Sequence, residues 1–183
     1  VNLIVTDNSN NTGSAPATVT VLDVTPPVVA TQNITVQLDP TGSVTITPAQ
    51  INNGSTDACG ITAFTLDRDT FDCTNVSVPN TVILTATDAS GNSATGTAVV
   101  TVVDVTPPVL VVQNIQAPLD ATGHVTITPA DIDNGSYDNC AIAGMSININ
   151  TFSCEDYGPN QVIITATDTS GLTSTATVIV TVV

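Results

Sequence analysis

Aspartate is the residue type in this sequence with the greatest capacity for chemistry. The chain has 16 acidic residues against one basic residue, Arg68, and Glu155 is the only glutamate. Short carboxylates suit turns and calcium-binding loops, where the side chain must reach back to its own backbone. Many recur at matched places, in the sets Asp23/Asp104, Asp39/Asp120, Asp57/Asp138 and Asp7/Asp88/Asp168. This recurrence indicates either repeated turns or repeated cation sites.

Four cysteines form the second candidate group. Cys73 follows Cys59 at the same spacing at which Cys154 follows Cys140. In a small, threonine-rich chain without lysine, such pairs indicate an oxidising compartment and predict one disulfide inside each module, Cys59–Cys73 and Cys140–Cys154. A loop of about 15 residues closed in this way is worth roughly 3 kcal/mol in the chain-entropy treatment. Zinc is the alternative, but one histidine in the whole chain supplies no ligand set.

The sequence repeats, and the repeat sets the size of the modules. The segment Asp23–Pro27 reads Asp-Val-Thr-Pro-Pro and returns 81 residues later as Asp104–Pro108. Asp7–Asp23 has the same length as Asp88–Asp104, and the residues around Asp7 match those around Asp88, so we interpret residues 1–23 as the C-terminal hairpin of a preceding repeat. The full repeats are then 24–104 and 105–183. A fixed period of this length indicates a tandem array of small modules that continues beyond both ends of the sequence.

Apolar and polar residues alternate through most of each repeat, which indicates β-strands. The alternating sets of the second repeat are Ile115, Ala117 and Leu119; Val125 and Ile127; Met145, Ile147 and Ile149; and Val162, Ile164 and Ala166. Turn signals such as Asp39–Gly42 separate the strands, and Thr47–Ile51 fits one helical turn with Pro48 at its first position. We therefore predict an all-β protein, a linear array of immunoglobulin-like β-sandwich modules with about seven strands each.

The expected strand directions bring recurring aspartates together. If neighbouring strands run antiparallel from the linker, three aspartates of each repeat meet at the end where the linker enters. They are Asp23, Asp57 and Asp88 in one repeat and Asp104, Asp138 and Asp168 in the next. Close carboxylates repel one another unless a cation binds them, and an oxygen-only set in flexible loops favours Ca²⁺. The further candidate ligands are Asn92, Asn139 and carbonyls around Ala58. The alternative is that each aspartate only caps its own turn.

Composition excludes several classes of function. The net charge of −15 leaves nothing to neutralise phosphates, so nucleic acid is excluded as a partner. The sequence has no apolar run of about 18 residues and no signal peptide, so we expect no membrane insertion of this segment. With one histidine, no Ser-His-Asp or Cys-His set can be drawn, and we expect no enzymatic activity.

Three motifs recur in a fixed order. They are Asp-x-Thr-Pro-Pro at Asp23–Pro27 and Asp104–Pro108, Thr-Asp-x-Cys at Thr56–Cys59 with its counterpart at Tyr137–Cys140, and Ala-Thr-Asp-x-Ser-Gly at Ala86–Gly91 and Ala166–Gly171. With these motifs the chain resembles hyalin-repeat (HYR) and related bacterial immunoglobulin-like modules, which occur in tandem in giant cell-surface adhesins. Its acidic, lysine-free style is similar to SprB-type adhesins of gliding bacteria. Leu172 stands where Asn92 does, which argues against an Asn92-type ligand at the second site.

The resemblance implies an immunoglobulin-like fold, an extracellular or cell-surface location, calcium at module junctions, and a role in adhesion or as a stalk. We therefore expect a structural repeat stiffened by calcium and disulfides, whose partners are neighbouring repeats and a surface polysaccharide or protein ligand. The alternatives are a calcium-dependent carbohydrate-binding module and a passive spacer of a secreted enzyme. A lone hairpin is marginal in water, so residues 1–23 are expected to be disordered, to pack on the first module, or to pair with another copy.

Overall fold

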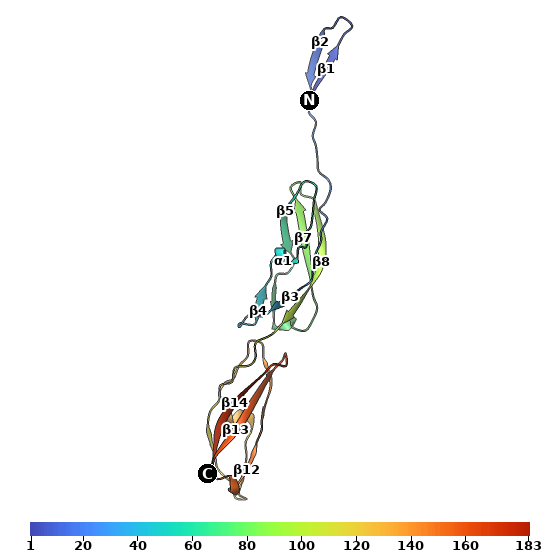
Figure 1. The fold of residues 1–183 in the computed structure, drawn as a ribbon. Coiled ribbons are helices and arrows are strands. Elements are labelled where there is room, and N and C mark those ends of the chain that lie inside the picture. The colour runs from blue at the N-terminus through green and yellow to red at the C-terminus, as the bar shows by residue number, and fades with distance from the viewer.

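A hairpin and two larger β-modules lie end to end along the chain (Figure 1). The computed structural model describes all residues from 1 to 183. Near the N-terminus, β1 (Asn2–Thr6) pairs antiparallel with β2 (Thr12–Pro16), and every residue of both strands is exposed. An extended segment, residues 17–22, separates this hairpin from the rest of the chain. The segment is therefore an ordered hairpin that does not pack on the first module, and its pairing with another copy stays a prediction.

The strands β3 to β8, here called module 1, form two facing layers. The elements are β3 (Ile34–Gln37), β4 (Ser43–Thr45), α1 (Pro48–Ile51), β5 (Ile61–Leu66), β6 (Thr70–Asp72), the 3-10 turn η1 (Cys73–Asn75), β7 (Asn80–Asp88) and β8 (Ser93–Val103). One layer is the four-stranded sheet β3-β8-β7-β5, in which β3 runs parallel to β8 and the other pairs are antiparallel. The other layer is the antiparallel pair β4-β6.

The strands β9 to β14, here called module 2, repeat this arrangement. The elements are β9 (Ile115–Ala117), β10 (His124–Thr126), α2 (Pro129–Ile132), β11 (Ile142–Ile147), β12 (Thr151–Ser153), η2 (Cys154–Asp156), β13 (Gly158–Asp168) and β14 (Thr173–Val182). The four-stranded sheet has the order β9-β14-β13-β11, and β10 pairs with β12. The all-β, immunoglobulin-like sandwich predicted from the sequence is confirmed, with six strands per module and short additional bridges such as Val28↔Thr56.

Each module has its own core, and the alternation in the sequence identifies most of it. In β7, Val82, Leu84 and Ala86 are fully buried while their neighbours face outward. The prediction is wrong for Ile149, which is 44% exposed because it lies in the turn between β11 and β12. Four core residues lie outside any alternating run and were not predicted: Ile51, Phe71, Ile132 and Phe152.

The two helical turns are capped by different chemistry. Both begin with proline after a threonine cap, as the sequence predicts for Thr47 and Pro48. In α1 the Thr47 N–H donates to Oε1 of Gln50 at 2.7 Å. In α2 the Thr128 N–H donates to a carboxylate oxygen of Asp131 at 2.7 Å. The cap of module 2 is therefore ionisable, whereas that of module 1 is not.

We expect Asp131→Gln, which copies the cap of module 1, to remove one acid-sensitive contribution to stability. Hydrogen bonds from the Thr128 backbone and hydroxyl hold the pKa of Asp131 below its ordinary value. A lowered pKa stabilises the fold above the unfolded-state value, and this contribution is lost as pH falls through the folded-state value. The stability of the wild type relative to Asp131→Gln should therefore be greater at pH 6 than below about pH 4. Thermal unfolding across this range measures the difference, and a constant difference would contradict the assignment.

Candidate functional site

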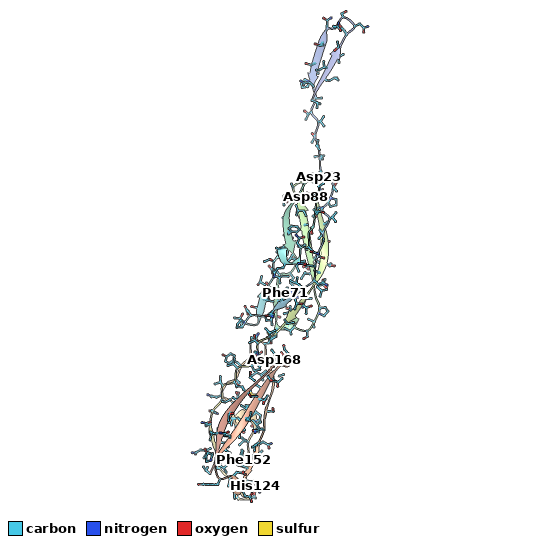
Figure 2. All side chains as sticks on the ribbon, viewed as in Figure 1. Asp23, Phe71, Asp88, His124, Phe152 and Asp168 are labelled. Carbon is cyan, nitrogen blue, oxygen red and sulfur yellow. A yellow bond between two sulfur atoms is a disulfide. The ribbon has the colours of Figure 1, made fainter.

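Two clusters of three aspartates occupy equivalent places in the two modules. One carboxylate oxygen from each member lies within 4.8 Å of the others in the sets Asp23/Asp57/Asp88 and Asp104/Asp138/Asp168. In cluster 1 the three residues come from the linker, from the loop between α1 and β5, and from the last position of β7. Figure 2 shows Asp23 and Asp88 together at the end of module 1 where the linker enters, and Asp168 at the corresponding end of module 2. We call this end of each module the linker pole and the opposite end the exit pole.

One oxygen of each aspartate caps its own turn. In cluster 1, each Oδ1 accepts the backbone N–H of the residue two positions later. The donors are Thr25 for Asp23 at 3.0 Å, Cys59 for Asp57 at 2.8 Å and Ser90 for Asp88 at 2.8 Å. In cluster 2 the corresponding donors are Thr106 at 3.1 Å, Cys140 at 2.9 Å and Ser170 at 2.8 Å. The turn-capping role considered from the sequence is therefore real, and it uses Oδ1.

The second carboxylate oxygen is left without a partner at most of these positions. Oδ2 is buried and accepts no hydrogen bond in Asp23, Asp57, Asp138 and Asp168. The Asp168 side chain is only 2% exposed, and the Oδ1 of the neighbouring Asn139 is buried and unpartnered as well. Buried acceptors in proteins nearly always have a partner, and an orphaned one costs about 1–3 kcal/mol. These oxygens are therefore free to accept a hydrogen bond or to bind a cation.

No side-chain cation compensates the clustered charge. The only basic residue, Arg68, donates to Asn75 Oδ1 at 2.6 Å, a residue of η1 at the exit pole. Within cluster 1, burial acts to raise the pKa of Asp88, but hydrogen bonds from Asn92, Ser90 and Gly91 outweigh it and hold the pKa below the ordinary value. The turn thus keeps this buried carboxylate ionised beside two others.

Each cluster also has one asparagine amide, supplied by a different loop. In cluster 1, Asn92 Nδ2 donates to Asp88 Oδ2 at 2.8 Å and to the Asp23 carbonyl at 3.2 Å. In cluster 2 the position of Asn92 is Leu172, and Asn139 Nδ2 lies 3.3 Å from Asp104 Oδ1. Both asparagines singled out from the sequence therefore lie at a cluster, one at each.

The exposed hairpin carries the same turn without a cluster. Asp7 Oδ1 accepts the N–H groups of Ser9 at 2.8 Å and Asn11 at 2.9 Å, and Asn11 Nδ2 donates to Asp7 Oδ2 at 2.9 Å. This matches the arrangement around Asp88 almost atom for atom. Asp7 has no other acidic residue grouped with it, which separates the turn from the cluster.

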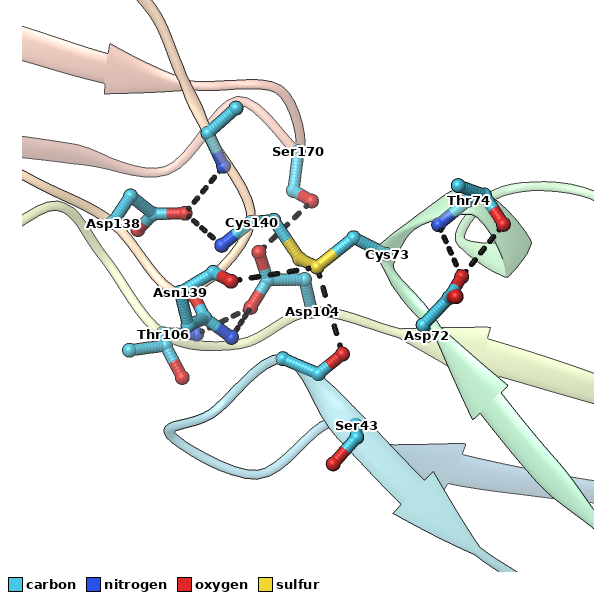
Figure 3. Close-up of a disulfide and its surroundings, with 12 residues drawn as sticks. Ser43, Asp72, Cys73, Thr74, Asp104, Thr106, Asp138, Asn139, Cys140 and Ser170 are labelled. Atoms are coloured by element: carbon cyan, nitrogen blue, oxygen red, sulfur yellow. Dashed lines mark hydrogen bonds between the residues drawn. A yellow bond between two sulfur atoms is a disulfide. The ribbon is translucent and has the colours of Figure 1, made fainter.

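The disulfide joins the two modules rather than closing a loop inside one. Cys73 of η1 is bonded to Cys140 in the loop before β11 (Figure 3), with a Cα–Cα distance of 5.4 Å. Cys59 and Cys154 are free and exposed. The predicted pairs Cys59–Cys73 and Cys140–Cys154 are therefore wrong. The physical reason is that β5 and β6 carry the chain from one pole of module 1 to the other. Cys59 lies beside Asp23 at the linker pole, where that carboxylate raises the pKa of the thiol, while Cys73 lies at the exit pole.

The exit pole of module 1 and the linker pole of module 2 pack closely around this disulfide. Asn139 Nδ2 donates to the Asp39 carbonyl at 3.2 Å, and Cys140 packs against the core of module 1. Gly42 is buried here with φ +78, and a Cβ built on it would lie 2.5 Å from the Asn139 carbonyl oxygen. Cluster 2 therefore lies at the junction, and the loop Asp138–Cys140 contributes to the cluster and to the disulfide.

Comparison with known proteins gives only distant structural likeness. No protein-family model and no curated protein matches the chain. It is similar to extracellular cadherin domains 1–4 of protocadherin gamma B7, at 14% identity and a TM-score of 0.38 over 86% of this chain and 51% of that one. It is also similar to immunoglobulin domains 1–4 of Sidekick-1, at 10% identity and a TM-score of 0.42 over 98% of this chain and 57% of that one. A third match is human mucin-like protocadherin EC1-2, at 13% identity and a TM-score of 0.38 over 86% and 98% of the two chains.

The chain thus spans about half the length of the first two of these structures. Identities and TM-scores at this level assign no function to it. Separately, neither of its short helices is long or apolar enough to cross a membrane.

We expect Gly42→Ala to weaken the junction, whereas Gly54→Ala should not. Both glycines have a positive φ, +78 and +81, so alanine introduces a similar backbone cost of roughly 1–2 kcal/mol at each. Only the Cβ at position 42 meets module 2, since nothing lies within 4 Å of a Cβ at position 54. The fraction of protein with the Cys73–Cys140 bond at equilibrium in a glutathione buffer should fall for Gly42→Ala alone. Equal fractions in the two variants would show that this contact does not hold the junction.

Proposed function

We propose that this chain is a structural segment of an extracellular, cell-surface adhesion protein of the hyalin-repeat-like type, in which a disulfide and calcium fix each module to the next. The observation that carries the proposal is the disulfide between Cys73 and Cys140, placed beside a buried cluster of three carboxylates at the module junction. Stable disulfides belong to oxidising compartments, which supports a location outside the cell. In this assignment 24–104 and 105–183 are the repeating modules and 1–23 is the end of a preceding one.

Calcium fits the chemistry of the clusters. Ca²⁺ takes six to eight oxygen ligands at about 2.3–2.6 Å and tolerates irregular loops. Each cluster offers three carboxylates that use Oδ1 in their own turns and bring one oxygen apiece to within 4.8 Å of the others. Unpartnered buried oxygens of Asp138, Asp168 and Asn139 supply the acceptors that such an ion requires. At cluster 1, Asn92 would add one further ligand if it turned its amide oxygen toward the carboxylates.

Softer metals fit less well. Zinc prefers thiolate and imidazole ligands. At cluster 2 the nearby cysteine, Cys140, is held in the disulfide, and the single histidine, His124, lies on β10 near the far end of module 2 (Figure 2). What remains near the carboxylates of cluster 2 is an oxygen set, which favours a hard cation, whereas cluster 1 also has the free thiol of Cys59 beside Asp23.

The linkers support a stiff array. Pro27 and Pro108, the last residues of the two Asp-Val-Thr-Pro-Pro segments, are both buried against their modules. Proline has a fixed φ, so the linker has little freedom to swing where it enters the module. The same linker supplies Asp104 to cluster 2, so an ion there would fasten the linker to two loops of module 2.

A carbohydrate-binding module is the weaker candidate. Sugar binding commonly uses aromatic platforms, and the exposed aromatic residues are Tyr137 at 59% and Tyr157 at 75%. Tyr137 precedes Asp138 at the linker pole of module 2, whereas Tyr157 follows η2 at its exit pole. The two rings therefore lie at opposite ends and form no common platform.

We expect calcium to stabilise the protein and a chelator to reverse the effect. Extracellular calcium modules bind with Kd of about 10⁻⁴–10⁻³ M, so calcium at ten-fold excess over Kd should add roughly 1.4 kcal/mol per site. Asp168→Asn should abolish binding at cluster 2, because it weakens a ligand whose second oxygen is buried and unpartnered. Calorimetric titration with Ca²⁺ and thermal unfolding in calcium or EDTA measure both effects.

Asp7→Asn is the matched control, because it alters the same turn where no cluster exists. It should leave calcium binding unchanged. Small-angle scattering in calcium and in EDTA reports the stiffness of the array at the same time. Unchanged melting temperature and unchanged dimensions after chelation would rule out calcium as the stiffening agent.

A further inference from the structure

The two free cysteines lie at opposite ends of the paired modules. Cys59 is at the linker pole of module 1, and Cys154 is at the exit pole of module 2, in η2. By the repeat, Cys59 corresponds to Cys140 and Cys154 corresponds to Cys73, the two residues that are bonded at the closed junction. Each open pole therefore carries one half of a link that exists in complete form elsewhere in the same molecule.

The surroundings of each free cysteine match those of its bonded counterpart. At the exit poles, Cys73 Sγ lies 3.6 Å from the Gly42 carbonyl, and Cys154 Sγ lies 3.7 Å from the Gly123 carbonyl. A Cβ built on Gly42 would meet Cys73 Sγ at 2.9 Å, and one built on Gly123 would meet Cys154 Sγ at 2.8 Å. The sulfur of Cys154 thus already has the position of a bonded Cys73.

The linker poles match in the same way. The Cys140 N–H donates to Asp138 Oδ1 at 2.9 Å, and the Cys59 N–H donates to Asp57 Oδ1 at 2.8 Å. Both loops sit over an aspartate cluster of the same composition. The loop that presents Cys59 is therefore built like the one that presents Cys140.

Burial shows what the open poles lack. Gly42 is buried under module 2, whereas the equivalent Gly123 is only half-buried. Cys73 and Cys140 are half-buried, whereas Cys154 and Cys59 are exposed. These differences all have the sign expected if the two open poles are surfaces that another module covers.

We propose that Cys59 and Cys154 are inter-module crosslinking sites, each of which forms a disulfide with the complementary cysteine of a further module of the same repeat. Two S–H bonds break and one Sγ–Sγ bond forms, while a small disulfide such as oxidised glutathione accepts the two electrons and two protons and is cleaved to its thiols. The result is a continuous series of identical links, one at every junction. These links rest on the proposed tandem array, in which they join each module covalently to the next, and they do not depend on calcium.

The predicted junction at the linker pole of module 1 differs by one residue from the junction between modules 1 and 2. Ala58 stands where Asn139 does, so the hydrogen bond from Asn139 to the Asp39 carbonyl has no counterpart when module 1 receives a preceding module. The cysteines and the glycine that makes room for them are unchanged. The disulfide therefore does not need this amide, although the junction without it has one hydrogen bond fewer.

A longer chain tests the proposal directly. A second copy of Asp23–Val183 is joined after Val183, so that an aspartate follows Val183 as Asp104 follows Val103. This fusion point keeps the register of β14, because the Leu119 N–H donates to the Val183 carbonyl as the Leu38 N–H donates to the Val103 carbonyl. The protein is refolded in a glutathione buffer, and its disulfides are mapped by peptic digestion and mass spectrometry. We expect a link between Cys154 of the first copy and Cys59 of the second. Only the Cys59 nearest the N-terminus and the Cys154 nearest the C-terminus should react with iodoacetamide.

The Cys73–Cys140 link in each copy is the internal control for folding. If both of those links form but the thiols at the new junction stay free, the proposal is wrong. It is equally wrong if the map shows Cys59–Cys73 or Cys140–Cys154 pairs. Cys59→Ser in the second copy alone should leave the adjacent Cys154 alkylated and the two Cys73–Cys140 links intact. Repeating the mapping in EDTA separates this result from calcium binding, since the links should form with or without the ion.

Discussion

The bond between Cys73 and Cys140 is the constraint on which the rest of the junction depends. A disulfide holds its two Cα atoms within about 4.4–6.8 Å, so the loop that presents Cys140 must stay on the exit pole of module 1. That loop is also where Asn139 reaches the Asp39 carbonyl and where Asp138 enters cluster 2. Three consecutive residues thus carry a ligand candidate, a contact between modules and a covalent link. Moving the loop would disturb all three together.

The disulfide and aspartate cluster 2 share the loop Asp138–Cys140. The chain has a net charge of −15, and cluster 2 places three carboxylates beside the junction with no basic residue near them. Buried at 7% and 2% exposure, Asp104 and Asp168 are screened little by solvent. The covalent link fixes the loop Asp138–Cys140 and so limits how far Asp138 can move within the cluster. Cluster 1 has the same three carboxylates beside the unbonded Cys59, so the fold of each module brings the carboxylates together and the link adds only this restraint.

Much of the fold follows from the sequence, but the cysteine pairing does not. Alternation identifies buried positions such as Val82 and Val162, and strand direction places Asp57 at the linker pole. The repeat period alone cannot distinguish a disulfide inside a repeat from one between repeats. Cys73 could pair with Cys59, which precedes it in the same repeat, or with Cys140 of the next repeat. The signal that decides is Cys59 itself, two residues after Asp57. The strand directions that place Asp57 at the linker pole also place Cys59 there. Cys73 follows β5 and β6, which run to the exit pole, so it lies far from Cys59.

The sequence fails to predict core residues in helical turns and very short strands for a different reason. Ile51 and Ile132 are fully buried, yet each is a single apolar residue at the end of a four-residue helical turn. A hydrophobic period needs several turns or strand residues to be visible. Phe71 and Phe152 lie in three-residue strands and have the same problem. Their burial is set by the facing sheet, which the local sequence does not describe.

Each cluster has one asparagine amide beside its three carboxylates, but the amide comes from a different loop in each module. Cluster 1 takes its asparagine from the β7–β8 turn, and Asn92 ties that turn to the linker through the Asp23 carbonyl. Cluster 2 has Leu172 in that turn and takes Asn139 from the cysteine loop instead, where the amide reaches the preceding module. One amide beside three carboxylates is thus retained while its origin changes. In cluster 1 the amide bonds only to its own module and linker, whereas in cluster 2 it bonds both to the linker residue Asp104 and to the preceding module, so modules of identical fold can differ in how firmly they are joined.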